Sequence, residues 1–132
     1  MKQEDKELLL KDLCARLPYG AKCIVKSDGY VGVISSIESQ YGVVTFDDGR
    51  QEEICDIKPY LFPLSSMTEE QIEEAKTYFW KDVDYGKSLV DKRINCFYPC
   101  FNILEFYHKN HFDYRGLIDK SLALDATVLN IY

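Results

Sequence analysis

Hydrophobic positions follow two different periods along this chain. Over 6–17 the apolar residues recur at steps of three and four, which predicts a helix that Pro18 and Gly20 end. Its apolar face is predicted to hold Leu9, Leu10, Leu13, Cys14 and Leu17, and its solvent face Lys6, Lys11, Asp12 and Arg16. Short apolar runs then follow closely, and they predict four strands at 22–27, 30–38, 41–47 and 50–56.

Two Asp-Gly pairs, Asp28-Gly29 and Asp48-Gly49, separate these runs. Asp-Gly between apolar runs is typical of β-hairpins, because glycine accepts the positive φ that tight hairpin turns need. Within the second strand, alternation places Tyr30 and Gly32 on one face and, on the other, Val31, Val33 and Ile37. Prolines at 59 and 63 restrict the segment after Ile57 to an edge strand, or to a 3₁₀ turn with a short strand.

The remainder of the chain is predicted to be mainly helical. Thr68 and Gln71 have the spacing of a capping box, and Met67 and Ile72 fit a hydrophobic staple around that helix start. Residues 82–99 are predicted to form an irregular connection. Helices are expected at 100–110 and, with Asp113 as N-cap, at 114–122. The apolar tail, 123–132, is expected to pack against the domain or against a second copy, which makes a homo-oligomer a prediction.

These elements predict an α+β fold in a single domain, 1–132. An N-terminal helix (1–20) precedes a β unit (21–64), which is either a small bent antiparallel sheet or an SH3-like barrel. A helical half (65–132) then completes the domain. A chain of 132 residues is of ordinary size for one domain and buries roughly two-thirds of its unfolded surface.

The charge balance indicates which classes of partner are disfavoured. The chain has 16 basic and 22 acidic residues, and the β unit is itself acidic. Nucleic acid and anionic membranes carry negative charge, so they are disfavoured as partners. We expect neither a signal peptide nor a membrane span, because no apolar run of sufficient length occurs. Five irregularly spaced cysteines favour free thiols in a reducing cytoplasm.

Part of the β unit resembles SH3-like small barrels of the Tudor type. The residues concerned lie within 30–56: Gly-Val-Ile-Ser-Ser-Ile, followed by Val-Val-Thr-Phe-Asp-Asp-Gly. The resemblance covers about a quarter of the chain and implies a barrel architecture. In such barrels, aromatic residues near the strand loops form the ligand groove and acidic residues form its rim.

Three other blocks resemble a family of small uncharacterised proteins from gut commensal bacteria and their mobile elements. They span 4–19, 57–70 (with Lys-Pro-Tyr-Leu and Ser-Ser-Met-Thr-Glu-Glu) and 111–124 (with His-Phe-Asp-Tyr-Arg-Gly-Leu-Ile). The 81–101 stretch departs from that pattern. The resemblance implies a bacterial cytoplasmic protein and brings no activity with it.

One group of residues has the composition of a metal site: Cys96, Cys100, His108 and His111. Zinc sites of this kind have a longer central gap and His-x₃₋₅-His. If 100–111 is one helix, the ends of that segment lie roughly 16 Å apart, too far for two ligands of one ion. Buried thiols and partly buried imidazoles are therefore favoured. A metal protein, or a thiol-dependent enzyme pairing Cys100 with His108, remains the alternative.

The candidate binding residues are aromatic and acidic side chains of the β unit: Tyr30, Tyr41, Tyr60, Phe62, Asp28, Asp47 and Asp48. The competing interpretation is that the aromatic rings only cover the core and that the carboxylates only stabilise the turns. The sequence contains no recognisable catalytic or cofactor motif. It therefore predicts a non-catalytic module, without a cofactor, that binds a protein or peptide. A nucleic-acid-associated barrel is the second alternative.

Overall fold

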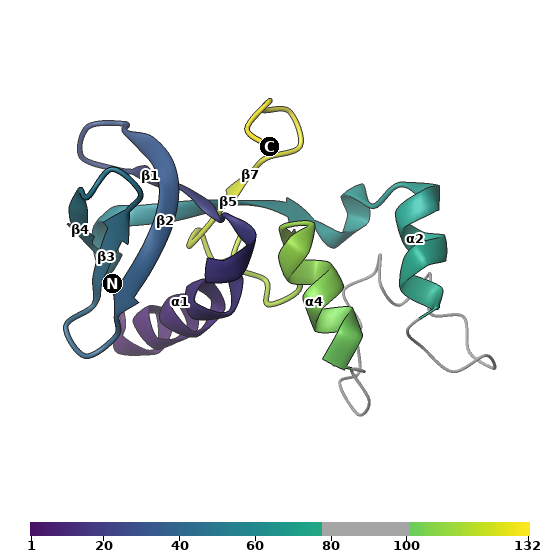
Figure 1. The fold of residues 1–132 in the computed structure, drawn as a ribbon, viewed down its shortest axis with the longest axis horizontal. Coiled ribbons are helices and arrows are strands. Elements are labelled where there is room, and N and C mark those ends of the chain that lie inside the picture. Colours follow the sequence, from purple (N-terminus) through teal and green to yellow (C-terminus); the bar gives the residue numbers. More distant parts are fainter. Residues whose placement is uncertain (78–100) are drawn as a thin grey trace.

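The computed structural model describes residues 1–77 and 101–132 (Figure 1). It confirms an α+β fold, in which helices pack against a mostly antiparallel sheet. The helices are α1 (Gln3–Arg16), α2 (Glu69–Lys76) and α4 (Phe101–Lys109), with 3₁₀ turns η1 (Leu17–Tyr19), η2 (Ile54–Asp56) and η3 (Leu64–Ser66). The strands are β1 (Lys22–Val25), β2 (Val31–Glu38), β3 (Val43–Phe46), β4 (Gln51–Glu53), β5 (Ile57–Pro63), β6 (Phe112–Asp113) and β7 (Leu124–Asp125).

The sheet is open rather than closed. Its strand order is β4-β3-β2-β1-β5-β6, and β7 also pairs with β5. Within the described residues β4 pairs with β3 alone, so the expected SH3-like barrel is not supported. A register shift between Ile34 and Ser36 interrupts the β2–β3 ladder, and β2 is strongly curved in Figure 1. Such an irregularity bends a strand and increases its twist, which accounts for the predicted bent sheet.

Both Asp-Gly corners form the predicted hairpins. Gly29 (φ 76°) lies between β1 and β2, and Gly49 (φ 91°) lies between β3 and β4. Each preceding aspartate stabilises its own turn, since Asp28 Oδ1 accepts a hydrogen bond from Tyr30 N at 3.0 Å and Asp48 Oδ1 accepts one from Arg50 N at 2.9 Å. This is the local bonding that favours aspartate in turns.

The predicted alternation of β2 is wrong in part. Ile34 is 1% exposed, whereas Val31 is 41% exposed. Strict alternation would turn Ser36 inward after Ile34, but the register shift adds a residue there. Ile37 therefore packs against the core instead of Ser36.

Strand β5 lies inside the sheet, so its prediction as an edge strand or 3₁₀ turn is wrong. Its first three residues pair with β1, and the later ones pair in parallel with β7 and β6. Pro59 occupies the last position paired with β1, and Pro63 is the last residue of the strand. Proline has no backbone N–H to donate. In β5 the two prolines therefore lie where the strand changes its pairing partner and where it ends.

Three positions of α1 were assigned to the wrong face. Asp12 and Arg16 are fully buried, on the same side as Leu9 and Leu13. Residues three and four apart share one helix face, so the spacing is compatible with this arrangement. No local pattern, however, indicates that a charged pair occupies the buried face of α1. Cys14, predicted to be inward, is exposed.

The buried residues of the described parts form two groups. The first lies between α1 and the sheet and includes Leu13, Ile34 and Leu61. The second lies among β6, α2 and α4 and includes Leu64 and Phe106. Figure 1 shows β5 running from the curled sheet to the helical half. This one strand therefore contributes residues to both buried groups.

The helical predictions have mixed outcomes. The capping box at Thr68 and Gln71 is confirmed, and α4 falls within the helix predicted at 100–110. The short helix predicted at 114–122 is wrong, because the chain turns there instead. Asp113 accepts hydrogen bonds from Leu117 N and Ile118 N, both at 2.9 Å, without a helix following. The predicted connection at 82–99 lies outside the described residues.

The C-terminal tail packs against the same chain. Strand β7 pairs with β5, and Ala126 N donates to Leu61 O at 2.8 Å. The Tyr132 hydroxyl donates to Tyr60 O at 3.0 Å and accepts from Lys22 N at 2.8 Å. Val128 is the most exposed apolar side chain of the tail, at 90%. Self-association through the tail stays a prediction.

Candidate functional site

Three predicted binding residues lie together where the two hairpin corners meet. The Tyr30 hydroxyl donates to Asp48 Oδ2 at 2.6 Å, and Arg50 Nη2 donates to Asp28 Oδ2. The Arg50 guanidinium lies 4.6 Å from the centroid of the Tyr30 ring. Tyr30 also packs edge-on against Phe46, with centroids 5.3 Å apart. The tyrosine therefore already has partners on its ring and its hydroxyl, and it ties one hairpin to the other.

The other predicted residues do not join this cluster. Tyr41 is 68% exposed in the loop between β2 and β3, and Tyr60 is only 5% exposed. Phe62 packs against Phe112 and Tyr132 at the opposite end of β5. Asp47 is exposed beside the second corner, and its backbone N donates to Val33 O at 2.9 Å. These aromatic residues therefore do not line one common groove.

The hydrogen bonds of the corners keep their carboxylates ionised. The bond from Arg50 lowers the pKa of Asp28, and the bond from Tyr30 lowers the pKa of Asp48. The bond to Asp48 in turn raises the pKa of the Tyr30 hydroxyl. Two negative charges and a neutral phenol therefore persist at this corner at neutral pH.

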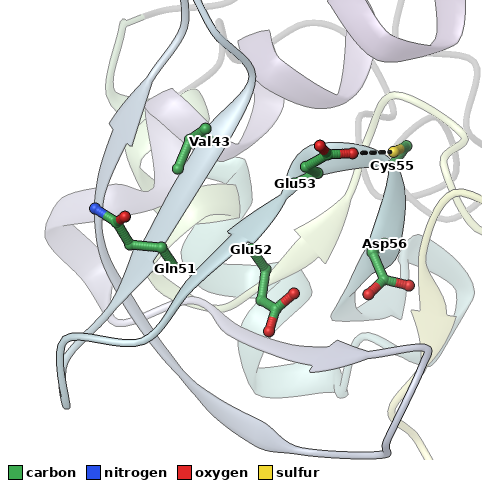
Figure 2. Close-up of a pocket in the computed structure, with 6 residues that line it drawn as sticks. All are labelled: Val43, Gln51, Glu52, Glu53, Cys55 and Asp56. Atoms are coloured by element: carbon green, nitrogen blue, oxygen red, sulfur yellow. Dashed lines mark hydrogen bonds between the residues drawn. The ribbon is translucent and has the colours of Figure 1, made fainter.

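Arg50 connects the corners to a hollow beside β4. Its Nε donates to Glu52 Oε1 at 2.8 Å. Glu52 lines a hollow of about 640 Å³ together with Val43, Gln51, Glu53, Cys55 and Asp56. Figure 2 shows the carboxylates of Glu52 and Asp56 extending to the same side, while the Cys55 thiol lies 3.5 Å from Glu53 Oε2. Among the residues that the structure describes, three carboxylates and no basic side chain line the hollow.

Strand β4 also presents unused backbone groups. Arg50 O accepts from Phe46 N, and Ile54 N donates to Gly42 O, both at 2.8 Å toward the β3 side. Hydrogen-bonded and non-hydrogen-bonded pairs alternate in an antiparallel ladder. The paired positions Gln51–Thr45 and Glu53–Val43 are therefore non-hydrogen-bonded. Their N–H and C=O groups point away from β3, and no partner for them lies within the described parts of the chain.

The structure brings no metal ligands together among residues 1–77 and 101–132. Cys96 and Cys100 lie outside the described residues. His108 Nε2 lies 2.7 Å from the Tyr114 hydroxyl, and the His111 ring stacks on Tyr132 with centroids 3.6 Å apart. Burial lowers the pKa of each histidine to about 4, so both rings are neutral at pH 7.

The described thiols differ in accessibility. Cys14 and Cys55 are exposed, while Cys23 is fully buried, and burial strongly raises its pKa. A nucleophilic cysteine needs a lowered pKa or a neighbouring base. Neither Cys14, whose pKa is raised by partial burial, nor Cys23 has a lowered one.

Sequence reasoning missed two parts of this site. The first is Arg50, which contacts Asp28, Tyr30 and Glu52. Its position directly after an Asp-Gly corner is the signal that could have found it. The second is the free side of β4, whose short polar sequence shows no apolar alternation.

Within the described residues, no helix combines the length and apolar character that a bilayer crossing requires. Comparisons of the chain with protein-family models, with curated proteins and with solved structures found no match.

Proposed function

We propose that this protein is a non-catalytic binding module that takes up an extended, basic segment of a partner protein along the free side of β4. The observation that carries the proposal is the outward row of backbone groups at Gln51 and Glu53, next to an open hollow. An extended segment that adds to a sheet edge gains main-chain hydrogen bonds, and side-chain pockets supply its specificity.

The negative charges beside β4 favour a partner segment with a positive charge. Glu52, Glu53 and Asp56 line the hollow, and the carboxylates of Asp28 and Asp48 lie just beyond Arg50. Lysine or arginine side chains in the incoming segment would meet these carboxylates. A phosphate backbone would meet like charge, which disfavours nucleic acid.

The same charges favour a different partner over a second copy of this chain. Pairing β4 with β4 would place carboxylates of one copy against those of the other, and like charges directly opposite each other destabilise a sheet. Charged residues on an edge strand commonly prevent such self-pairing.

A peptide titration tests the proposal. The probe is an acetylated, amidated Lys-Val-Lys-Val-Lys peptide, followed by backbone amide NMR shifts of the ¹⁵N-labelled protein. We expect saturable shifts at 50–56, and none with the Glu-Val-Glu-Val-Glu peptide.

Two variants test the backbone and the charge contributions to binding separately. Gln51→Pro removes an outward N–H without removing a backbone hydrogen bond between β3 and β4, and it should weaken binding while the fold persists. Glu53→Gln with Asp56→Asn should weaken binding and reduce its salt dependence. Glu69→Gln with Glu70→Gln, on α2 at the far end of the molecule, is the charge-matched control. Shifts that fall elsewhere, or equal binding by Gln51→Pro, would refute the proposal.

A further inference from the structure

A second hollow lies at the other end of β5, where α4 ends and α2 begins. It encloses about 430 Å³, which is within the range of small-molecule sites. Its apolar lining comes from Phe62, Phe112 and Tyr132, which belong to β5, β6 and the tail. Phe62 contacts both other rings, with centroids 6.4 Å from Phe112 and 5.9 Å from Tyr132. We call this the aromatic hollow.

The polar lining of the aromatic hollow is rich in hydrogen-bond donors. Lys109, Gln71 and Thr68 line it, and none of its described lining residues is an aspartate or glutamate. Among the described residues, the Lys109 ammonium has one loose carboxylate neighbour, Glu74, at 3.9 Å, and both side chains are about half exposed. A chain with 22 acidic residues thus has a hollow in which, among the described lining residues, the one charged side chain is basic.

His111 supplies a further donor and an unusual backbone. Its φ is 61°, in the left-handed region that non-glycine residues seldom adopt. Its Nδ1 is buried without a hydrogen-bond partner. A neutral ring with its proton on Nε2 buries no unpaired N–H at Nδ1 and leaves the Nε2–H free to donate. Backbone strain of this kind persists where surrounding structure holds it, commonly at binding sites.

We propose that the aromatic hollow binds a small planar carboxylate. The apolar ring of the ligand would pack against Phe62 and Tyr132, because Phe112 is only 2% exposed. Its carboxylate would accept hydrogen bonds from Lys109, Gln71 and the Nε2–H of His111. This site is separate from the free side of β4, and its occupant has the opposite charge.

Benzoate is the probe that tests this site, and benzamide, which has the same ring and no charge, is its comparator. We expect benzoate to shift the amides of Phe62, His111 and Phe112 saturably in a ¹⁵N NMR titration. Lys109→Gln removes a charged donor and should weaken benzoate binding about tenfold. Lys120→Gln, an exposed lysine outside the hollow, is the matched control and should leave binding unchanged.

Each outcome of the benzoate titration either supports the proposed site or refutes it. Benzoate selectivity that depends on Lys109 supports the site. Equal binding of benzamide, an unchanged Lys109→Gln titration, or no saturable shift at 10 mM benzoate (on the order of ten times a weak millimolar dissociation constant) would overturn it. A second sample with a Gly-Ser extension after Tyr132 removes any terminal charge near the hollow, and the same result is expected from it.

Discussion

The buried ion pair between Asp12 and Arg16 gives the sharpest stability prediction. Both side chains are fully buried, and Arg16 Nε lies 2.7 Å from Asp12 Oδ2. Arg16 Nη2 also donates to Phe112 O at 2.6 Å, and Arg115 Nε lies 3.1 Å from Asp12 Oδ1. One carboxylate thus faces two guanidinium groups, which join α1 to the segment after α4.

The two single substitutions should therefore differ in cost. Asp12→Asn leaves two guanidinium groups without a carboxylate between them, and removing one partner of a buried pair costs about 3–5 kcal/mol of unfolding free energy. Arg16→Met leaves Asp12 with Arg115, so a smaller loss of about 1–3 kcal/mol is expected from the lost charged hydrogen bonds. The double variant removes a carboxylate and a guanidinium together. It should be more stable than Asp12→Asn alone.

Urea unfolding followed by far-UV circular dichroism measures these free energies, and a double-mutant cycle isolates the pair. Lys11→Gln, an exposed change on the same helix, is the control and should stay within about 0.5 kcal/mol of wild type. If Asp12→Asn costs less than about 1 kcal/mol, or if the two losses simply add in the double variant, the reasoning from burial is wrong.

Three further predictions address other regions. A Cβ at Gly32 would lie 2.9 Å from the Tyr30 ring and 3.0 Å from Phe46, so Gly32→Ala should cost about 1–3 kcal/mol in urea unfolding; a neutral effect would contradict the observed packing. Arg50→Gln removes the main cause of the lowered Asp28 pKa, which should rise in a carboxyl ¹³C NMR titration; no change would contradict that cause. His108 and His111 have native pKa values of about 4, below the ordinary value of about 6.5, so the unfolded chain takes up protons first as the pH falls. The melting temperature should therefore fall between pH 6.5 and 4, and less steeply in the His108→Gln/His111→Asn variant; equal slopes would refute this.

Local signals predicted the local structure well. Asp28-Gly29, Asp48-Gly49 and the Thr68–Gln71 box specify bonds within a few residues, and each forms as expected. Their bonding is complete within one turn, so a single sequence suffices to recognise it.

Errors arose where distant residues decide the outcome. The burial of Arg16 depends on Phe112 and Arg115, about a hundred positions away, and no short window contains that information. The interior place of β5 depends on strands at 112–113 and 124–125, which are too short to show alternation. Asp113 bonds the next backbone N–H groups much as an N-cap does, so the helix-start signal was real although no helix follows.

For the candidate site, the corners were predictable and the free side of β4 was not. Asp28 and Asp48 belong to the predicted turns, and they meet Tyr30 and Arg50 there. Tyr30, Tyr60 and Phe62 were all selected as aromatic residues of the β unit, but Tyr60 is buried in the middle of β5 and Phe62 packs against Tyr132 near the end of that strand.

The order in which the chain is made gives β5 a particular vulnerability. Strands β1 to β5 are contiguous and can assemble as soon as residue 63 is available, whereas β6 and β7 are synthesised some 50 and 60 positions later. Until then neither β6 nor β7 can pair with the latter half of β5, which contains the apolar residues Tyr60, Leu61 and Phe62. A nascent chain halted before residue 112 should therefore associate with chaperones or with itself more readily than the finished protein.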